Sequence, residues 1–428
     1  MCSEHLSTVD LVGIGFGPSN LALAIALEEH NRTAATPITA QFFERRDRFQ
    51  WHPGMLLPGA TMQVSFLKDL ATQRNTASDY TFLKYLAERD RLTDFINLQT
   101  FFPLRSEFHD YLQWAAARVS IPVQYSSEVT SVRWHDGAFE VRTPTAACRA
   151  RHLVLGGGIR AKLPAGVVAG RRVFHNHDVL DRFAELPEST HGAFAVIGAG
   201  QSAAEVTAFL HQETDAQVHA VFAKYGYTPA DDSPYANRIF DPGAVDDYFA
   251  AQPAWRERIL TYHRGTNYSA VDPELINELY RREYTERVDG HRRLFVHGCT
   301  EVHDVVETDD AARLRVVNRM NGEELEILCD AVVFATGFEP TPIGDMLGDL
   351  GRFCHADVHG RPVLDRSYRL RTDPEVTGAI YVQGNSEHTH GLTATLLSNV
   401  AVRSGEIVES LSAHVSTRNG TGRRTAVL

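Results

Sequence analysis

The sequence has few cysteines, and their spacing provides neither a disulfide framework nor a redox pair. The five are scattered along 428 residues without any Cys-x-x-Cys, at Cys2, Cys148, Cys299, Cys329 and Cys354. This pattern excludes a cysteine-based zinc site and a flavin disulfide reductase, which needs a cysteine pair. It is typical of a protein in a reducing cytoplasm.

An excess of positive charge and a long apolar run are also missing. The formal net charge is −12, which argues against nucleic acid or an anionic membrane as the main partner. No basic segment precedes the first apolar stretch, and glycines, Pro18 and Asn20 interrupt it. It therefore predicts a strand and turn, not a signal peptide or membrane span, so we expect a cytoplasmic protein. The length predicts two or three domains.

Two glycine-rich turns are prominent instead. The first reads Gly13-Ile-Gly-Phe-Gly-Pro-Ser19, and the second reads Gly198-Ala-Gly-Gln-Ser-Ala-Ala-Glu205. Each follows an apolar run and opens a helix-like stretch, where backbone N–H groups can approach a pyrophosphate. One such turn is a weak signal, because tight turns also use glycine. Two of them predict two dinucleotides, and the economical pairing is a flavin with a nicotinamide.

The segments around the turns predict an α/β protein. A strand over 9–14, a helix over 18–29 and a strand over 39–44 form a Rossmann-like unit. Glu44 ends that second strand, where the spacing favours a ribose-binding carboxylate over an ordinary exposed glutamate. Residues 80–118 predict helices interrupted near Pro103, and short strands follow at 121–125, 128–134 and 138–143.

Two further apolar segments decide the expected domain boundaries. Residues 153–158 and 332–338 each predict a buried parallel strand ending in a glycine turn. The second glycine turn lies between them, so we expect a nicotinamide domain inserted into a discontinuous flavin domain. The predicted domains are 1–187 with 328–428 for FAD, 188–224 with 290–327 for NADPH, and a small helical region over 225–289.

Segments spread over nearly the whole chain resemble the N-hydroxylating flavoprotein monooxygenases that act on ornithine or lysine. Besides both glycine turns, these are Trp51-His52, 65–71, 108–114, 230–235, 266–269, 335–338, 389–392 and 396–398. Ser65-Phe-Leu-Lys-Asp-Leu70 combined with Asp231-Asp-Ser-Pro234 and Thr266-Asn-Tyr-Ser269 resembles the ornithine branch. Lysine hydroxylases share Phe-Leu-Lys-Asp-Leu without the other two motifs.

The resemblance implies an L-ornithine N5-monooxygenase. NADPH would reduce FAD, O2 would add to give a C4a-hydroperoxyflavin, and the side-chain amine would attack it. The N5-hydroxyornithine formed would serve siderophore or related natural-product biosynthesis, and the family suggests a homo-oligomer, a tetramer or dimer. An L-lysine N6-hydroxylase stays open, since one methylene discriminates by only about 1–3 kcal/mol. An NADPH oxidase or a non-catalytic dinucleotide sensor stays open as well.

Four residues form the predicted amino-acid clamp, and the helical region over 225–289 is the expected substrate-binding region. Lys68 stands in an otherwise apolar stretch, where the alternatives are a snorkelling lysine or a pair with Asp69. The resemblance implies that Lys68 binds the substrate carboxylate. It implies that Asn237 and Asn267 contact the amino acid, with Asn267 positioning the reacting amine, although both also suit turns or caps. Ser398 is the fourth, and it also suits an ordinary helix.

The resemblance also implies cofactor contacts, for several of which core or surface roles are the alternative. For FAD they are Gly13, Gly15, Gly17, Pro18, Ser19, Glu44, Trp51, His52, Gln63, His390, Gly391 and Leu396. For NADPH they are Gly198, Gly200, Gln201, Ser202, Glu205, Lys224, Asp232 and Ser233. Ala223 stands where the family often has an arginine for the 2′-phosphate, and Lys224 beside it supplies charge without the bidentate fork. The histidines at 175, 177, 388 and 390 lack a third ligand at metal-binding spacing, so no metal is expected.

Overall fold

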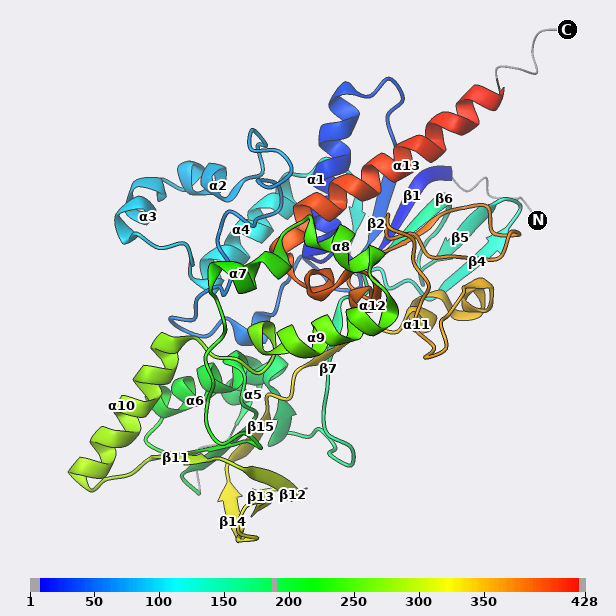
Figure 1. Ribbon diagram of the computed structural model, residues 1–428. Coiled ribbons are helices and arrows are strands. Elements are labelled where there is room, and N and C mark those ends of the chain that lie inside the picture. The colour runs from blue at the N-terminus through cyan, green and yellow to red at the C-terminus, as the bar shows by residue number, and fades with distance from the viewer. Residues whose placement is uncertain (1–7, 187–190, 423–428) are drawn as a thin grey trace, which may run out of the picture.

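The computed structural model describes residues 8–186 and 191–422, with the side chains of 266, 267 and 416–422 excluded. Two mainly parallel sheets lie one above the other in Figure 1, each with layers on both faces. We call each sheet with its covering elements the first unit and the second unit. The predicted α/β fold with two Rossmann-like units is confirmed.

The first sheet is built on four parallel strands around the first glycine turn. Their order is β3 (Val123–Gln124), β2 (Ala40–Phe43), β1 (Thr8–Ile14) and β6 (Ala147–Leu155). The far edge of β6 pairs with β5 (Ala138–Arg142) near its start and with β17 (Ile380–Val382) near its end, and β4 (Ser131–His135) pairs with β5. Leu11, Val12 and Leu153 are fully buried because both faces of the sheet are covered.

Helices cover one face of the first sheet. They are α1 (Pro18–Thr33), α4 (Arg105–Arg118) and α13 (Val400–Gly422), with α2 (Phe82–Glu88) and α3 (Leu92–Leu98) farther out. Figure 1 shows α13 running beside α1. The other face is covered by α11 (Ile343–Leu347) and the residues that follow it. The helices expected over 80–118 are confirmed, with the break before Arg105.

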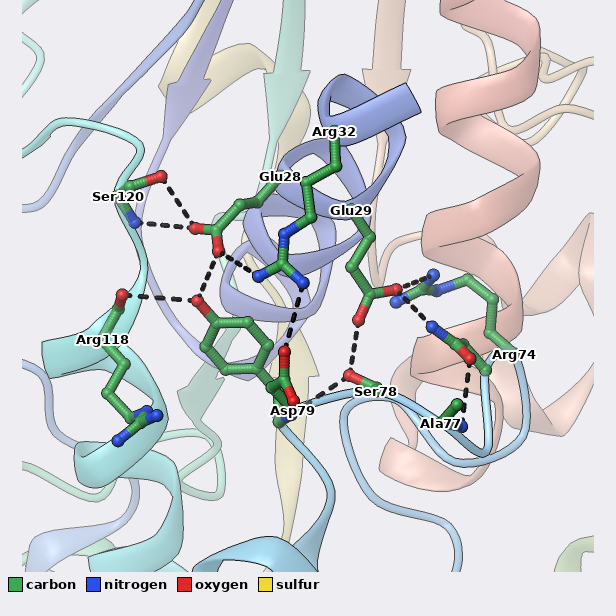
Figure 2. Close-up of polar contacts among 11 residues, drawn as sticks. Glu28, Glu29, Arg32, Arg74, Ala77, Ser78, Asp79, Arg118 and Ser120 are labelled. Carbon is green, nitrogen blue, oxygen red and sulfur yellow. Dashed lines mark hydrogen bonds and ion pairs between the residues drawn. The ribbon is translucent and has the colours of Figure 1, made fainter. Parts of the chain in front are cut away.

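A polar network fastens the end of α1 to the loop that follows the predicted substrate segment. Glu28 accepts hydrogen bonds from the Tyr80 hydroxyl at 2.7 Å and the Ser120 N–H at 2.8 Å. Glu29 accepts from Arg74 at 2.7 Å, as Figure 2 shows, and from Asn75 at 3.0 Å. The loop is therefore hydrogen-bonded to the C-terminal part of the helix that begins at the first glycine turn.

The second sheet contains five parallel strands. Their order is β11 (Leu294–His297), β10 (Gln217–Val221), β9 (Ala193–Ile197), β15 (Ala331–Phe334) and β8 (Val173–His175). One face carries α5 (Val179–Glu185), α6 (Gln201–Glu213) and α10 (Pro273–Asp289). The other carries an antiparallel sheet of β12 (Thr300–Glu307), β13 (Ala312–Asn318) and β14 (Glu324–Cys329).

Strands β8 and β15 correct the expected boundaries. The expected first unit comprises 1–187 and 328–428, but residues 173–175 and 331–334 hydrogen-bond within the second sheet. The chain passes between the units at a two-stranded pair, β7 (Ile159–Ala161) with β16 (Phe338–Pro340). The boundaries therefore lie near 162 and 337. A buried parallel strand has the same apolar pattern in either sheet, so the pattern alone did not distinguish them.

The helical region expected over 225–289 divides between the two units. Figure 1 shows α7 (Pro234–Asn237), α8 (Ala244–Ala250) and α9 (Pro253–Asn267) beside the first unit, whereas α10 lies on α6. Leu279 of α10 is buried against the α6 core that includes Val206 and Leu210. No helix in the described ranges is both long and apolar enough to cross a membrane.

Candidate functional site

The first glycine turn has the geometry that a dinucleotide requires. Gly15 has φ +82°, and a Cβ there would lie 2.5 Å from the Gly156 carbonyl oxygen. Only glycine permits both this backbone conformation and this approach of β1 to β6. Gly17 precedes α1 and Pro18 occupies its first turn, and the space beside Gly17 is open. A helix N-terminus with open space in front of it fits a pyrophosphate.

Glu44 lies beside this turn. One carboxylate oxygen accepts a hydrogen bond from the Phe16 N–H at 2.7 Å, and the other accepts from the Arg46 N–H at 2.9 Å. The carboxylate therefore holds the loop between β1 and α1, at the position where a ribose-binding carboxylate belongs. Its contact with a ribose stays a prediction.

Arg403 is a residue at this turn that sequence reasoning missed. It is 2% exposed and donates to Gln383 at 3.2 Å, to the Ala394 carbonyl at 2.7 Å and to Ser19 at 3.3 Å. Gln383 in turn donates to Asn20 at 2.8 Å. An arginine within the apolar run Val400-Ala-Val-Arg403 was the available signal, the same kind of anomaly that singled out Lys68.

Trp51, His52 and Gln63 lie on the segment between β2 and α2. The Trp51 ring meets His52 at 5.1 Å and Phe108 at 6.1 Å, both edge to face. Burial lowers the pKa of His52 to about 3, helped by the nearby His177, so its imidazole is neutral at physiological pH. Gln63 is exposed, consistent with either a surface role or a role facing a ligand.

Residues 386–399, which include the predicted FAD contacts His390, Gly391 and Leu396, do not form the start of the last helix. A short helix α12 (Glu387–His390) is followed by 3-10 turns at 392–395 and 397–399 before α13. The N–H groups of 389, 390 and 391 donate to Ser386 and Glu387 within that turn, so they are not free for a flavin edge. His390 stacks on Tyr368 at 4.1 Å. Leu396 lies between the two 3-10 turns.

Lys68 lies next to the helical region. Its ammonium is 5.9 Å from the Phe240 ring centroid, and Phe240 belongs to a 3-10 turn packed against residues 392–395. Burial lowers the pKa of Lys68, while Asp241 opposes that shift. Asp69 does not pair with Lys68, because its carboxylate accepts from the N–H groups of 71, 72 and 82 and from the Thr72 hydroxyl.

The other three predicted substrate residues lie in different surroundings. Asn237, at the end of α7, donates its side-chain N–H to the Asp232 carbonyl at 2.8 Å. Ser398 is buried in the turn before α13. Asn267 ends α9, and its side chain lies outside the described residues. The structure thus brings Lys68 close to the turn after Asn237, and that turn packs against the chain leading to Ser398.

The second glycine turn also fits a dinucleotide. Gly198 has φ +145°, and a Cβ there would lie 2.3 Å from the Ala335 carbonyl oxygen. Gly200 caps α6, and a Cβ there would lie 3.4 Å from the Ser269 Cα. Lys224 donates to the Ser269 carbonyl at 2.6 Å and to Thr228 at 2.8 Å. Lys224 and the 266–269 motif therefore meet at this turn.

Some of the remaining predicted NADPH residues already make contacts within the protein, and others are exposed. Ser233 caps α7 by accepting from the Ala236 N–H at 3.4 Å, and Asp232 is exposed beside it. Ser202 lies partly exposed in the first turn of α6. Glu205 differs from prediction, since both its carboxylate oxygens accept from Arg105. Among the described residues no group of three or more metal-ligating side chains is present.

The sequence model for L-lysine 6-monooxygenase/L-ornithine 5-monooxygenase matches residues 7–340. The chain belongs to this family. Two of its curated members, both ornithine enzymes, illustrate the similarity. The L-ornithine N(5)-monooxygenase of Pseudomonas aeruginosa is 37% identical over 431 residues, covering 97% of this chain and 96% of that protein. The L-ornithine N(5)-oxygenase of Arthrobotrys oligospora is 38% identical over 427 residues, covering 94% and 88%.

Solved structures of the family have the same architecture. The ornithine N-hydroxylase of Kutzneria sp. 744, in a complex named with reduced FAD, NADP+ and L-ornithine, superposes with a TM-score of 0.91 at 46% identity. The alignment covers 95% of this chain and all of that one. The L-lysine 6-monooxygenase of Pseudomonas syringae superposes with a TM-score of 0.83 at 30% identity, covering 95% and 99%. Both substrate branches therefore share this fold.

Proposed function

We propose that this family member hydroxylates the side-chain nitrogen of L-ornithine, using FAD, NADPH and O2. The observation that carries the proposal is the position of Lys68, a half-buried cation without a carboxylate hydrogen-bonded to it among the described contacts. The similarity to an ornithine N-hydroxylase complex over 95% of the chain supports the same substrate.

Two glycine turns on separate sheets support separate sites for the two cofactors. FAD would lie at the first turn, with Gly13, Gly15 and Gly17 admitting its pyrophosphate and Glu44 at its ribose. NADPH would lie at the second turn, with Gly198, Gly200 and Ser202 around its pyrophosphate and Lys224 near the 2′-phosphate. Bound FAD, once reduced, supplies the oxygen-activating chemistry, which no side chain can provide.

The protein's own task is to bind the amino acid and to keep water away. The Lys68 ammonium would bind the substrate carboxylate, while Asn237, Asn267 and Ser398 would hold its two amines. The reacting amine must be neutral, yet a free alkyl amine has a pKa of about 10.4. A site that excludes water favours the uncharged amine and limits loss of the activated oxygen as peroxide.

Lysine hydroxylation is the competing function. The lysine enzyme of Pseudomonas syringae is 30% identical, against 46% for the Kutzneria ornithine enzyme. The two substrates differ by one methylene, which a pocket discriminates by about 1–3 kcal/mol. The combination of Asp231-Asp-Ser-Pro234 and Thr266-Asn-Tyr-Ser269 favours ornithine. Initial rates of hydroxylamine formation from each amino acid test this choice, and faster hydroxylation of lysine would overturn it.

We further propose a cytoplasmic homo-oligomer, a dimer or tetramer, that supplies N5-hydroxyornithine for siderophore or related biosynthesis. Ile96, Leu98, Phe101 and Phe102 are 47–63% exposed on and after α3, which supports burial of this patch against another subunit. None of the cysteines in the described ranges forms a disulfide, which supports a reducing compartment. Light scattering after size-exclusion chromatography measures the assembly, and a monomer at micromolar concentration would contradict it.

A further inference from the structure

The side chain of Arg105, which is 12% exposed, joins the two units. It begins α4 of the first unit, and its guanidinium donates two parallel hydrogen bonds to Glu205 on α6 of the second unit. The Nη1–Oε2 and Nη2–Oε1 distances are 2.8 and 2.7 Å. The same nitrogens donate to the carbonyls of Met55 and Thr61 at 3.1 and 3.2 Å. Four contacts thus fix one guanidinium between segments of both units.

The contacts continue from Glu205 into the helical region. The side-chain amide of Gln201 donates to the Glu205 carboxylate at 2.9 Å, and its Oε1 accepts from the Asp272 N–H at 2.8 Å. Asp272 is the N-cap of α10, which leads the chain back to the second sheet. We call Arg105, Glu205, Gln201 and Asp272 the interunit network.

The interunit network reaches a predicted cofactor segment in each unit. Gln201 directly follows Gly200 of the second glycine turn, and Thr61 lies two residues before Gln63. The Ala60 carbonyl also accepts from the Arg105 N–H at 2.8 Å, so backbone and side chain of one residue hold that segment. The network therefore connects the segment expected at the nicotinamide cofactor to the segment expected at the flavin.

The Arg105–Glu205 pair is chemically suited to holding the two units in a fixed relative position. The Arg105 and Glu205 side chains are only 12% and 6% exposed, so water screens their attraction weakly. A planar guanidinium on a carboxylate fixes orientation as well as distance, which a lysine cannot do. Hydride transfer depends steeply on such placement, because a displacement of about 1 Å can cost about 100-fold in rate.

We propose that the interunit network positions the NADPH turn against the flavin segment, and so sets both the rate of flavin reduction and the yield of hydroxylated product per NADPH. The proposal rests on the proposed function for the identity of the product. Arg105 and Glu205 act here as positioning residues, since their contacts are with protein groups.

Three variants of the FAD-loaded enzyme test the proposal. Arg105→Lys keeps a charge without the fork, and Glu205→Gln keeps the shape without the charge. The double variant Arg105→Met/Glu205→Gln removes both charges together. Glu29→Gln is the matched control, because it breaks a similar pair with Arg74 (2.7 Å, with 17% and 11% exposure) within the first unit alone (Figure 2).

The measurements distinguish an effect on the placement of the NADPH turn from an effect on the stability of the protein. We expect each single variant to retain FAD, to lower Tm, and to slow anaerobic flavin reduction at saturating NADPH by about tenfold or more. Hydroxyornithine per NADPH should fall, with hydrogen peroxide making up the difference. In the double variant Tm should recover, because no buried charge is left unpaired, while reduction stays slow. Glu29→Gln should lower Tm and change neither rate nor yield.

Two results would overturn the proposal. One is that both single variants lose stability as Glu29→Gln does, with wild-type reduction rate and product yield. The other is that the double variant recovers the reduction rate together with Tm, which would make the network a stabilising contact only. If the wild-type enzyme hydroxylates neither ornithine nor lysine, the proposed function fails. The anaerobic reduction rate would then still test the interunit network by itself.

Discussion

The ammonium of Lys68 lies 5.9 Å from the centre of the Phe240 ring, so a cation of the first unit lies beside the 3-10 turn over 238–240. The lysine follows a stretch anchored by Phe66, which meets Phe95 and Phe101 at 5.3 and 5.9 Å. Asp69 is occupied by backbone N–H groups and a threonine hydroxyl. Lys68 is therefore placed to receive an anionic group.

Replacing Lys68 should weaken amino-acid binding selectively. In Lys68→Ala the substrate carboxylate loses a charged partner worth about 1.5–3 kcal/mol, so the KM for ornithine should rise about 10- to 100-fold. FAD content and the KM for NADPH should not change. Steady-state kinetics measure this, with Lys84→Ala on the exposed face of α2 as the control. An unchanged KM for ornithine would make the carboxylate assignment wrong.

Substituting Gly198 should impair NADPH binding and leave FAD in place. An alanine there would meet the Ala335 carbonyl and would have to adopt φ +145°, strain of about 1–3 kcal/mol. The first glycine turn lies on the other sheet and is not affected. Titration of NADP+ against the FAD-bound protein should show weaker binding in Gly198→Ala, whereas Gly344→Ala, in open space, should bind normally. Loss of FAD instead of NADP+ would reverse the assignment of the two turns.

Lys224 and Ala223 test the preference for the phosphorylated nicotinamide cofactor. Removing the Lys224 charge should cost about 1 kcal/mol with NADPH, a rise in KM of about fivefold, and nothing with NADH. Ala223→Arg should have the opposite effect, because an arginine fork binds phosphate bidentately. The ratio of kcat/KM for NADPH over NADH measures both. If removing the Lys224 charge lowered kcat/KM equally for NADPH and NADH, Lys224 would serve only to hydrogen-bond Ser269 and Thr228.

The pKa of His390 predicts an acid dependence of stability. Burial against Tyr368 lowers this pKa from 6.5 to about 3, so the folded protein keeps the ring neutral while the unfolded chain takes up a proton. Stability should therefore fall as pH drops below 6.5, by about 2 kcal/mol at pH 5 for this residue.

The matching variant is His390→Gln, which removes this proton uptake. Its Tm should be lower than the wild-type value at pH 7, yet it should decline less between pH 6.5 and pH 4. His359→Gln, on an exposed turn, serves as the control. Parallel Tm curves for wild type and His390→Gln would show that the histidine ring does not titrate on unfolding.

Local patterns predicted the parts of the fold whose structure is local. Each glycine turn lies between a buried strand and a helix, as its sequence indicates, because φ and backbone approach restrict those positions to glycine. The sheet that contains β15 was predicted wrongly, since Val332 and Val333 would be buried equally well in either sheet. Pairing of distant strands depends on topology, which a single apolar run does not encode.

The site residues likewise divide into those that a local sequence pattern indicates and those that depend on contacts between distant segments. Lys68 was recognisable as a charge in an apolar segment, and Arg403 carried the same signal without being noticed. The contact between Arg105 and Glu205 joins residues 100 positions apart. The sequence around either residue gives no sign that it contacts the other. Glu205 was assigned to NADPH because it belongs to the glycine motif, whereas its carboxylate is occupied by Arg105.

The most direct test of the account is a product assay with purified FAD-bound protein, NADPH and O2, comparing ornithine, lysine and shorter diamines that lack the carboxylate. We predict N5-hydroxyornithine as the main product, formed in near-stoichiometric ratio to NADPH oxidised, with less product from lysine and little from the diamines. Oxidation of NADPH that yields only hydrogen peroxide with every amine would contradict the account.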